Sequence, residues 1–131
     1  MSSLSDKLKS ILDYVAERVK TVVTNVYLSE REKVRLPCAF VMLAEHAIEQ
    51  TAFNTVRHTC AVTVTILHEA ADVETGYKEL IDKLCSVRDA LQQDRTLGGL
   101  VLDSLVTRLT IPRRQFMRHI GVLTLECWWR E

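Results

Sequence analysis

The sequence has no excess of charge of either sign, because 17 lysine and arginine residues balance 17 aspartate and glutamate residues. Dedicated nucleic-acid binding usually needs a basic excess on one face, so this balance argues against that class of protein. The sequence also lacks an apolar run near the ~20 residues that a membrane-spanning helix requires. Residues Met1 to Asp6 are polar and no apolar segment follows them, so we expect no signal peptide and no membrane association.

Closely spaced cysteines are absent as well. Cys38, Cys60, Cys85 and Cys127 form no CxxC pair; three lie in apolar runs and one lies in a predicted helix. This spacing is typical of reduced thiols in a cytosolic fold, and it favours neither a disulfide framework nor a local zinc site.

No motif announces catalysis. His58 and Cys60 share one face of a predicted strand, and His46 and His68 could lie near them. These residue types could in principle form a zinc site or a catalytic Cys–His pair. Structural zinc sites normally use paired ligands in local turns, and no flanking signature accompanies these residues. The pair Gly98-Gly99 belongs to neither a GxGxxG nor a Walker loop, so a phosphate cradle is not predicted. We therefore expect no enzyme, no metal and no cofactor.

What the sequence does contain is the composition of one globular domain spanning residues 1–131, with 47% hydrophobic residues. Apolar residues at three- and four-residue spacing predict helices from Ser3 to about Val23 and from Asp72 to about Leu91. Runs with alternating or continuous apolar character predict five strands, at residues 36–43, 45–54, 55–68, 100–111 and 119–129. The order α-β-β-β-α-β-β predicts an α+β fold, a mostly antiparallel sheet with both helices packed on one face.

The alternation predicts which strand faces point inward. In the strand 55–68 the even-numbered residues, from Val56 to His68, form the better core face, whereas the odd face is rich in threonine and alanine. The strand 100–111 alternates Leu105 and Leu109 against Ser104 and Val106. In the last strand Trp129 shares a face with apolar residues and Trp128 shares the other with Glu126 and Arg130, so the two tryptophans cannot point into the same core. An aromatic residue flanked by charges is typical of an interface anchor.

Three segments between these elements carry the remaining predictions. The connector Thr24–Arg35 is longer than most connections, and the loop Pro112–Arg118 is basic, so either could order against a neighbouring molecule. The turn Asp94–Gly99 places two glycines where the chain must reverse, and we expect positive φ there. The predicted turn residues are Asp94, Thr96, Gly98 and Gly99. The candidate residues for contact with another copy of the chain or with another protein are Arg31, Lys33, Arg35, Arg113, Arg114, Phe116, Arg118 and Trp128.

As a whole this pattern resembles the tail terminator (tail completion, minor tail) proteins of long-tailed phages. The resemblance is carried by the N-terminal amphipathic helix, the Leu36-Pro37 strand entry, the strand ending in residues 62–67, and the helix after Asp72. Its most specific part is the turn Asp94-Arg95-Thr96-Leu97-Gly98-Gly99 between helix and strand. The resemblance covers nearly the whole chain.

The resemblance implies a virion structural protein that forms a ring, usually a hexamer, at the end of the tail tube. Such a ring stops tube polymerisation and offers a surface for head–tail joining. Its partners would be copies of itself, the tail tube protein and the neck connector, while DNA passes through the lumen without specific binding. It would be found in the virion tail and, during assembly, in the host cytoplasm. Two alternatives stay open: another neck or head-completion protein of similar fold, and a small ligand-binding α+β domain.

Overall fold

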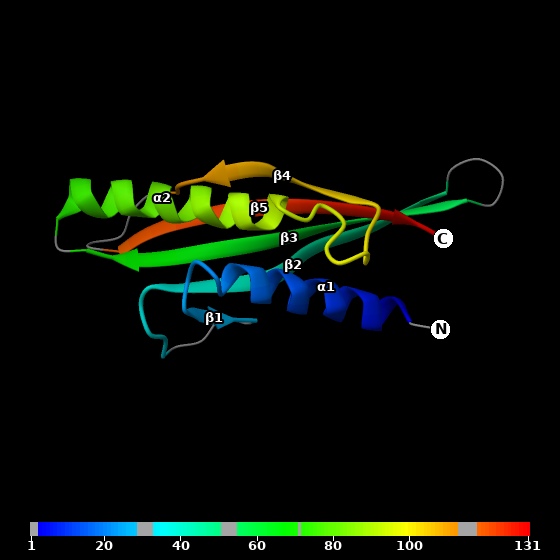
Figure 1. Ribbon diagram of the computed structural model, residues 1–131, viewed down its shortest axis with the longest axis horizontal. Helices are drawn as coiled ribbons and strands as arrows, with labels where there is room; N and C mark the ends of the chain where they lie inside the picture. The colour runs from blue at the N-terminus through cyan, green and yellow to red at the C-terminus, as the bar shows by residue number, and fades with distance from the viewer. Residues whose placement is uncertain (1–2, 29–32, 51–54, 71, 113–117) are drawn as a thin grey trace.

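The computed structural model describes residues 3–28, 33–50, 55–70, 72–112 and 118–131. These residues form two helices and five strands in the predicted order α-β-β-β-α-β-β (Figure 1). The elements are α1 (Leu4–Val19), β1 (Asn25–Tyr27), β2 (Cys38–Gln50), β3 (Val56–Glu69), α2 (Val73–Gln92), β4 (Asp103–Thr110) and β5 (Arg118–Arg130). The α+β fold class predicted from the sequence is confirmed.

One sheet carries all five strands, in the spatial order β1-β2-β3-β5-β4. Only the β1–β2 pair is parallel, and the other three pairs are antiparallel. Both helices lie along the same face of the sheet (Figure 1). Within the described residues no helix covers the opposite face, and the threonine-rich side of β3 lies there.

Helix α1 begins where the sequence predicts. The Ser3 side chain accepts a hydrogen bond from the backbone N–H of Asp6, and the Asp6 carboxylate accepts one from the backbone N–H of Ser3, which is a capping box. The helix turns Ile11, Val15 and Val19 onto the sheet, where all three are fully buried. Its regular part ends at Val19 rather than near Val23, because residues 20–22 form a turn that carries Val23 into the core.

Helix α2 lies very close to β5. Its N-cap is Asp72, whose carboxylate accepts a hydrogen bond from the backbone N–H of Thr75. Two glycines permit the approach: a Cβ atom on Gly76 would lie 2.4 Å from His119 Nε2, and one on Gly121 would lie 2.7 Å from Leu84 Cδ1. The buried residues of α2 are Gly76, Leu80, Leu84, Val87 and Leu91.

The central strands bury the predicted faces. In β3 every even-numbered residue from His58 to His68 is buried, and the odd-numbered residues between them are partly exposed. In β5 Trp129 is 3% exposed and belongs to the core, whereas Trp128 lies on the face without helices. The two tryptophans therefore point to opposite faces, as predicted.

The first two strands differ from the prediction. The segment Thr24–Arg35 is not only a connector, because Asn25–Tyr27 form β1 against Cys38–Phe40 of β2. The Asn25 side chain donates hydrogen bonds to the carbonyls of Arg35 and Pro37, which fixes this short parallel pairing. The predicted strands 36–43 and 45–54 are one strand, β2, and the expected turn between them is a bulge between Leu43 and Glu45. Residues 51–54 lie outside the described part.

Strand β4 also departs from the simple alternation. It begins at Asp103 rather than Leu100, because Leu97–Leu102 remain in the turn that starts at Asp94. Ser104 is fully buried, whereas Leu105 and Leu109 are each 43% exposed. A bulge between Val106 and Arg108 shifts the alternation by one residue, so that odd-numbered side chains lie on opposite faces of the sheet before and after it. The apolar residues of β4 are thus divided between the two faces of an edge strand.

Candidate functional site

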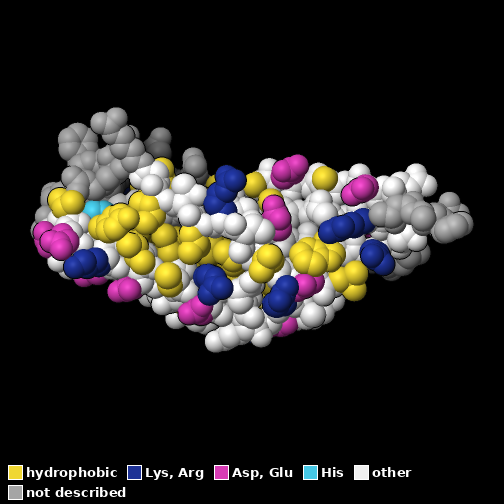
Figure 2. All heavy atoms as spheres, turned by 90° about the horizontal axis from the view of Figure 1, so that it is seen from above, with side chains coloured by type: hydrophobic (Ala, Val, Ile, Leu, Met, Phe, Trp, Pro, Cys, Tyr) yellow, Lys and Arg dark blue, Asp and Glu magenta, His cyan; other side chains and the backbone are white. Residues whose placement is uncertain are grey.

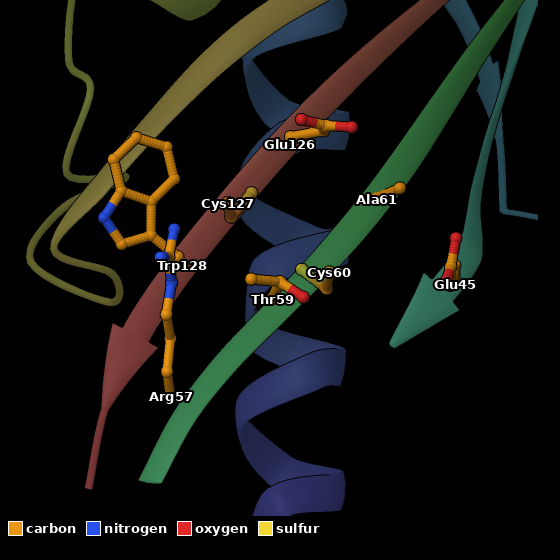
Figure 3. A pocket seen from close by; sticks show the side chains of 8 residues that line it. All are labelled: Glu45, Arg57, Thr59, Cys60, Ala61, Glu126, Cys127 and Trp128. Atoms are coloured by element: carbon orange, nitrogen blue, oxygen red, sulfur yellow. The ribbon is translucent and has the colours of Figure 1, made fainter. Parts of the chain in front are cut away.

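The face of the sheet without helices holds a shallow depression of about 290 Å³ (Figure 3). Arg57 and Trp128 form one wall, and the Arg57 guanidinium lies over the Trp128 ring, 5.7 Å from its centre. Glu45 of β2 and Glu126 of β5 lie toward the other end of the depression. One basic and two acidic side chains on an open floor suit contact with a polar protein surface rather than enclosure of a small molecule.

Beneath this depression two thiols face the helices. Cys60 of β3 and Cys127 of β5 are directly opposite each other in the sheet, and both are buried. The hydrogen bond between them lowers the pKa of Cys60 and raises the pKa of Cys127, and burial raises the pKa of both. Cys38 is buried as well, Cys85 is exposed, and all four cysteines are free thiols. Cys60 and Cys127 are both part of the hydrophobic core beneath the depression.

Two of the histidines considered as metal ligands from the sequence, His46 and His58, lie in contact. His46 Nε2 lies 3.1 Å from His58 Nδ1, and both rings stack with Trp129, whose other neighbour is the Lys7 ammonium 5.2 Å from its centre. His58 Nε2 also lies 3.2 Å from Glu131 Oε2. Among the described residues no group of three or more histidine, cysteine, aspartate or glutamate side chains is arranged to hold a metal ion.

The third histidine lies elsewhere. His68 is at the far end of β3, opposite His119, and its Nε2 lies 2.5 Å from Glu79 Oε2 of α2. The contact ties β3 to α2 and has no connection with the depression.

The turn between α2 and β4 is organised by one carboxylate. Asp94 accepts hydrogen bonds from the Tyr14 hydroxyl at 2.8 Å, the Thr96 hydroxyl at 2.8 Å and the Gly98 backbone N–H at 2.8 Å. These hydrogen bonds, that of Tyr14 first, lower the pKa of Asp94 to about 2. Gly98 and Gly99 have φ of 68° and 87°, which are values that favour glycine. The turn predicted from the sequence is therefore held by hydrogen bonds to Asp94, and the hydrogen bond from Tyr14 also connects it to α1.

The candidate contact residues do not gather in one place. Lys33 and Arg35 are exposed beside β1, and Trp128 lines the depression near the opposite edge. Arg118 opens β5 opposite Glu69, and its side chain lies outside the described part. Arg31, Arg113, Arg114 and Phe116 also lie outside the described residues. The predicted interface roles stay predictions.

A surface that the sequence did not single out lies along α2 and β4. Seen from the β4 side, apolar side chains form a band over these two elements (Figure 2). The exposed apolar residues of α2 and β4 with the residue after it are Val73, Tyr77, Leu105, Leu109 and Ile111. The four-residue spacing of Leu105 and Leu109 was visible in the sequence. The face of the sheet on which each side chain lies depends on a bulge that no local pattern indicates.

Comparisons with known proteins support the fold. No family model matches the chain, and no curated protein matches it either. Among solved structures, a chain of the "Virion of native gene transfer agent (GTA) particle" matches with a TM-score of 0.50. The match covers 89% of this chain and 92% of that chain, at 10% sequence identity. At this identity the likeness shows a shared fold.

No helix of the described residues is long and apolar enough to cross a membrane.

Proposed function

We propose that this protein is a structural component of a phage-like virion, and that within the virion it is the tail terminator. It forms a closed ring, of six subunits, on the last ring of the tail tube. There it stops tube polymerisation and presents the surface on which the head is joined. It acts without catalysis and without a cofactor.

One observation carries the proposal: the fold likeness to a chain of a gene transfer agent virion spans nearly all of both chains. A likeness that covers 92% of the other chain describes a whole subunit rather than a shared fragment. The tail terminator resemblance of the helix–turn–strand segment around Asp94–Gly99 adds the position within the particle.

The surface chemistry suits this role. The depression beside Trp128 is shallow and mixed in charge, as expected of a contact surface between proteins. The formal net charge is zero, and tight binding of DNA requires an excess of basic residues. A ring of these subunits is therefore compatible with DNA that passes through its lumen without being bound. The apolar band on α2 and β4 gives a monomer an exposed surface to bury on assembly.

The test is to locate the protein in purified particles with an antibody raised against it. We expect one gold label per particle, at the junction of head and tail. Label along the whole tail, at the distal tip or on the head would contradict the terminator position, and absence from the particle would contradict a virion component. A label at the junction, together with the number of copies per particle, separates a ring of six from a neck protein of another symmetry.

A further inference from the structure

The sheet ends in two open edges. β4 pairs only with β5, so its outer edge from Asp103 to Thr110 has no strand beside it in the described structure. At the other end, β1 covers only Cys38–Phe40 of β2, which leaves the outer edge of Val41–Gln50 without a strand partner among the described residues. Open edges present rows of unpaired backbone groups that pair readily with another strand.

We propose that the β4 edge of one copy pairs with the β2 edge of a second copy, so that the sheet continues from subunit to subunit. This inference rests on the proposed ring and says which surfaces close it. The contact joins two different edges of the same chain, which is the heterologous kind of contact that generates rings.

Strand direction and length both allow this pairing. β2 and β4 are antiparallel within one subunit, since each of the steps from β2 to β3, β5 and β4 reverses direction. A second copy in the same orientation therefore presents its β2 antiparallel to the first copy's β4. β4 has 8 residues, and the 10 residues of β2 beyond β1 can accommodate it.

The side-chain faces fix a register. Arg108 lies opposite Thr124, Thr124 opposite Thr63, and Thr63 opposite Met42, all on the face without helices. Glu45 lies opposite Ala61 on the same face. Suppose that Arg108 of one copy lies opposite Glu45 of the next, and that the helix-free faces of the two sheets lie on the same side. Residues Asp103–Thr110 then lie alongside Met42–Glu49 of the second copy and do not overlap β1.

Charge complementarity supports this register. Arg108 and Glu45 are exposed, and neither has an ion-pair partner among the described residues. At the end of the pairing Asp103 would meet Glu49, but Asp103 is already paired with Arg95 at 2.8 Å. Opposite charges directly across two antiparallel strands stabilise the pair, and like charges disfavour it. In this register Leu105 meets Ala47 and Leu109 meets Leu43, so apolar residues of β4 would be covered.

The two bulges would lie on either side of the Arg108–Glu45 pair. β2 has its bulge between Leu43 and Glu45, and β4 has its bulge between Val106 and Arg108. Bulges at sheet edges discourage pairing with arbitrary strands, because an ordinary strand does not match them. In the proposed register the shift introduced by the β4 bulge is cancelled one pair later by the β2 bulge, and the added bend helps a continued sheet to curve. The bulges therefore select the second copy over other strands.

Charge reversal tests the pairing. We expect Arg108→Glu alone and Glu45→Arg alone to weaken self-association of the purified protein by at least about tenfold, because each sets like charges face to face. The double variant Arg108→Glu/Glu45→Arg restores the pair and should recover the wild-type oligomer in light scattering. Lys9→Glu, a charge reversal at an exposed position of α1 outside the two paired strands, is the control and should leave the oligomer unchanged. Failure of the double variant to recover association, with all variants folded, would overturn the register.

Cross-linking tests which edges meet. In a Cys85→Ser background, Ala47→Cys and Leu105→Cys are combined in one chain, and the concentrated protein is oxidised. We expect a ladder of covalent oligomers that stops at the ring size, whereas a mixture of the two single variants gives only dimers. Dimers from Leu105→Cys alone would mean that two β4 strands pair with each other, and monomers from the combined variant would mean that the edges do not meet. Either result overturns the inference.

The two proposals fail separately. Without cross-links, but with antibody label at the head–tail junction, the terminator role stands and the edge pairing is wrong. With a cross-linked ring from a protein that is missing from particles, the edge pairing stands and the terminator role is wrong.

Discussion

Asp94 shows how one side chain can hold two distant segments together. Its carboxylate accepts from Tyr14 of α1, from Thr96 and from the backbone N–H of Gly98, so it links α1 to the turn between α2 and β4. All of these donors favour the ionised carboxylate, and they lower its pKa from 3.8 to about 2.

The first prediction follows from the sign of this shift. Because the folded pKa is depressed, Asp94 stabilises the fold above its unfolded pKa of 3.8, and the contribution is lost as the pH falls through about 2. We expect the urea midpoint of the wild type to exceed that of Asp94→Asn at neutral pH. The difference should stay constant down to about pH 5 and shrink toward zero near pH 2. A difference that does not depend on pH would mean that Asp94 acts without its charge.

The second prediction concerns Leu84, which is 2% exposed and packs against the space over Gly121. Leu84→Ala should cost about 2–5 kcal/mol of unfolding free energy through the cavity that it leaves. Gly121→Ala should cost about 1–3 kcal/mol, because the new Cβ meets Leu84. In the double variant the smaller residue 84 makes room for the larger residue 121.

Denaturant titration of the four proteins checks this as a double-mutant cycle. We expect the loss in the double variant to be smaller than the sum of the two single losses. Additive losses would show that residues 84 and 121 do not share this contact.

At the scale of elements, the close approach of α2 to β5 reverses the usual effect of a glycine in a helix. Gly→Ala in a helix normally stabilises by up to about 1 kcal/mol. Gly76 is different, since an added Cβ would lie 2.4 Å from His119 Nε2 and 2.8 Å from the Ala70 Cβ. We therefore expect Gly76→Ala to lower the unfolding free energy by about 1–3 kcal/mol.

The matched control is Ser86→Ala, an exposed position of the same helix. It should be neutral or stabilise by up to about 0.5 kcal/mol, in line with helix propensity alone. Both variants are measured by guanidinium denaturation. A gain in stability for Gly76→Ala would contradict the separation between α2 and β5 described above.

The helices and central strands were predictable because their signals are local. Ser3 and Asp72 cap the helices at the predicted residues, and the even face of β3 is buried from His58 to His68. The outer strands were harder, because their arrangement depends on partners distant in sequence. β1 is three residues long and is defined by pairing with β2, while the bulges in β2 and β4 appear only in the register with β3 and β5.

The candidate site was predictable only in part, for the same reason. The facing of Trp128 followed from strand alternation, and the turn at Asp94 followed from its glycines. The sequence did not reveal that Arg57 covers Trp128, or that Arg108 and Glu45 lie on opposite edges of one face. These relations arise from the sheet order, in which β5 lies between β3 and β4.

At the scale of the whole molecule, the described part of the chain has one sheet face covered by helices, one uncovered face and two unlike open edges. A subunit of this kind can repeat around an axis while both edges are satisfied, which closed symmetry requires. If the edges pair as proposed, the protein studied alone should show only part of the stability that it has in the ring, because burial of the edges adds to it.

The length of the tails in particles made without this protein tests the central claim most directly. Tail lengths are measured by electron microscopy after deletion of the gene and after its return on a plasmid. The proposed terminator predicts tails that are longer and more variable than normal, together with heads that carry no tail, and both defects disappear when the wild-type gene is returned. Tails of normal length joined to heads in the deletion strain would contradict it.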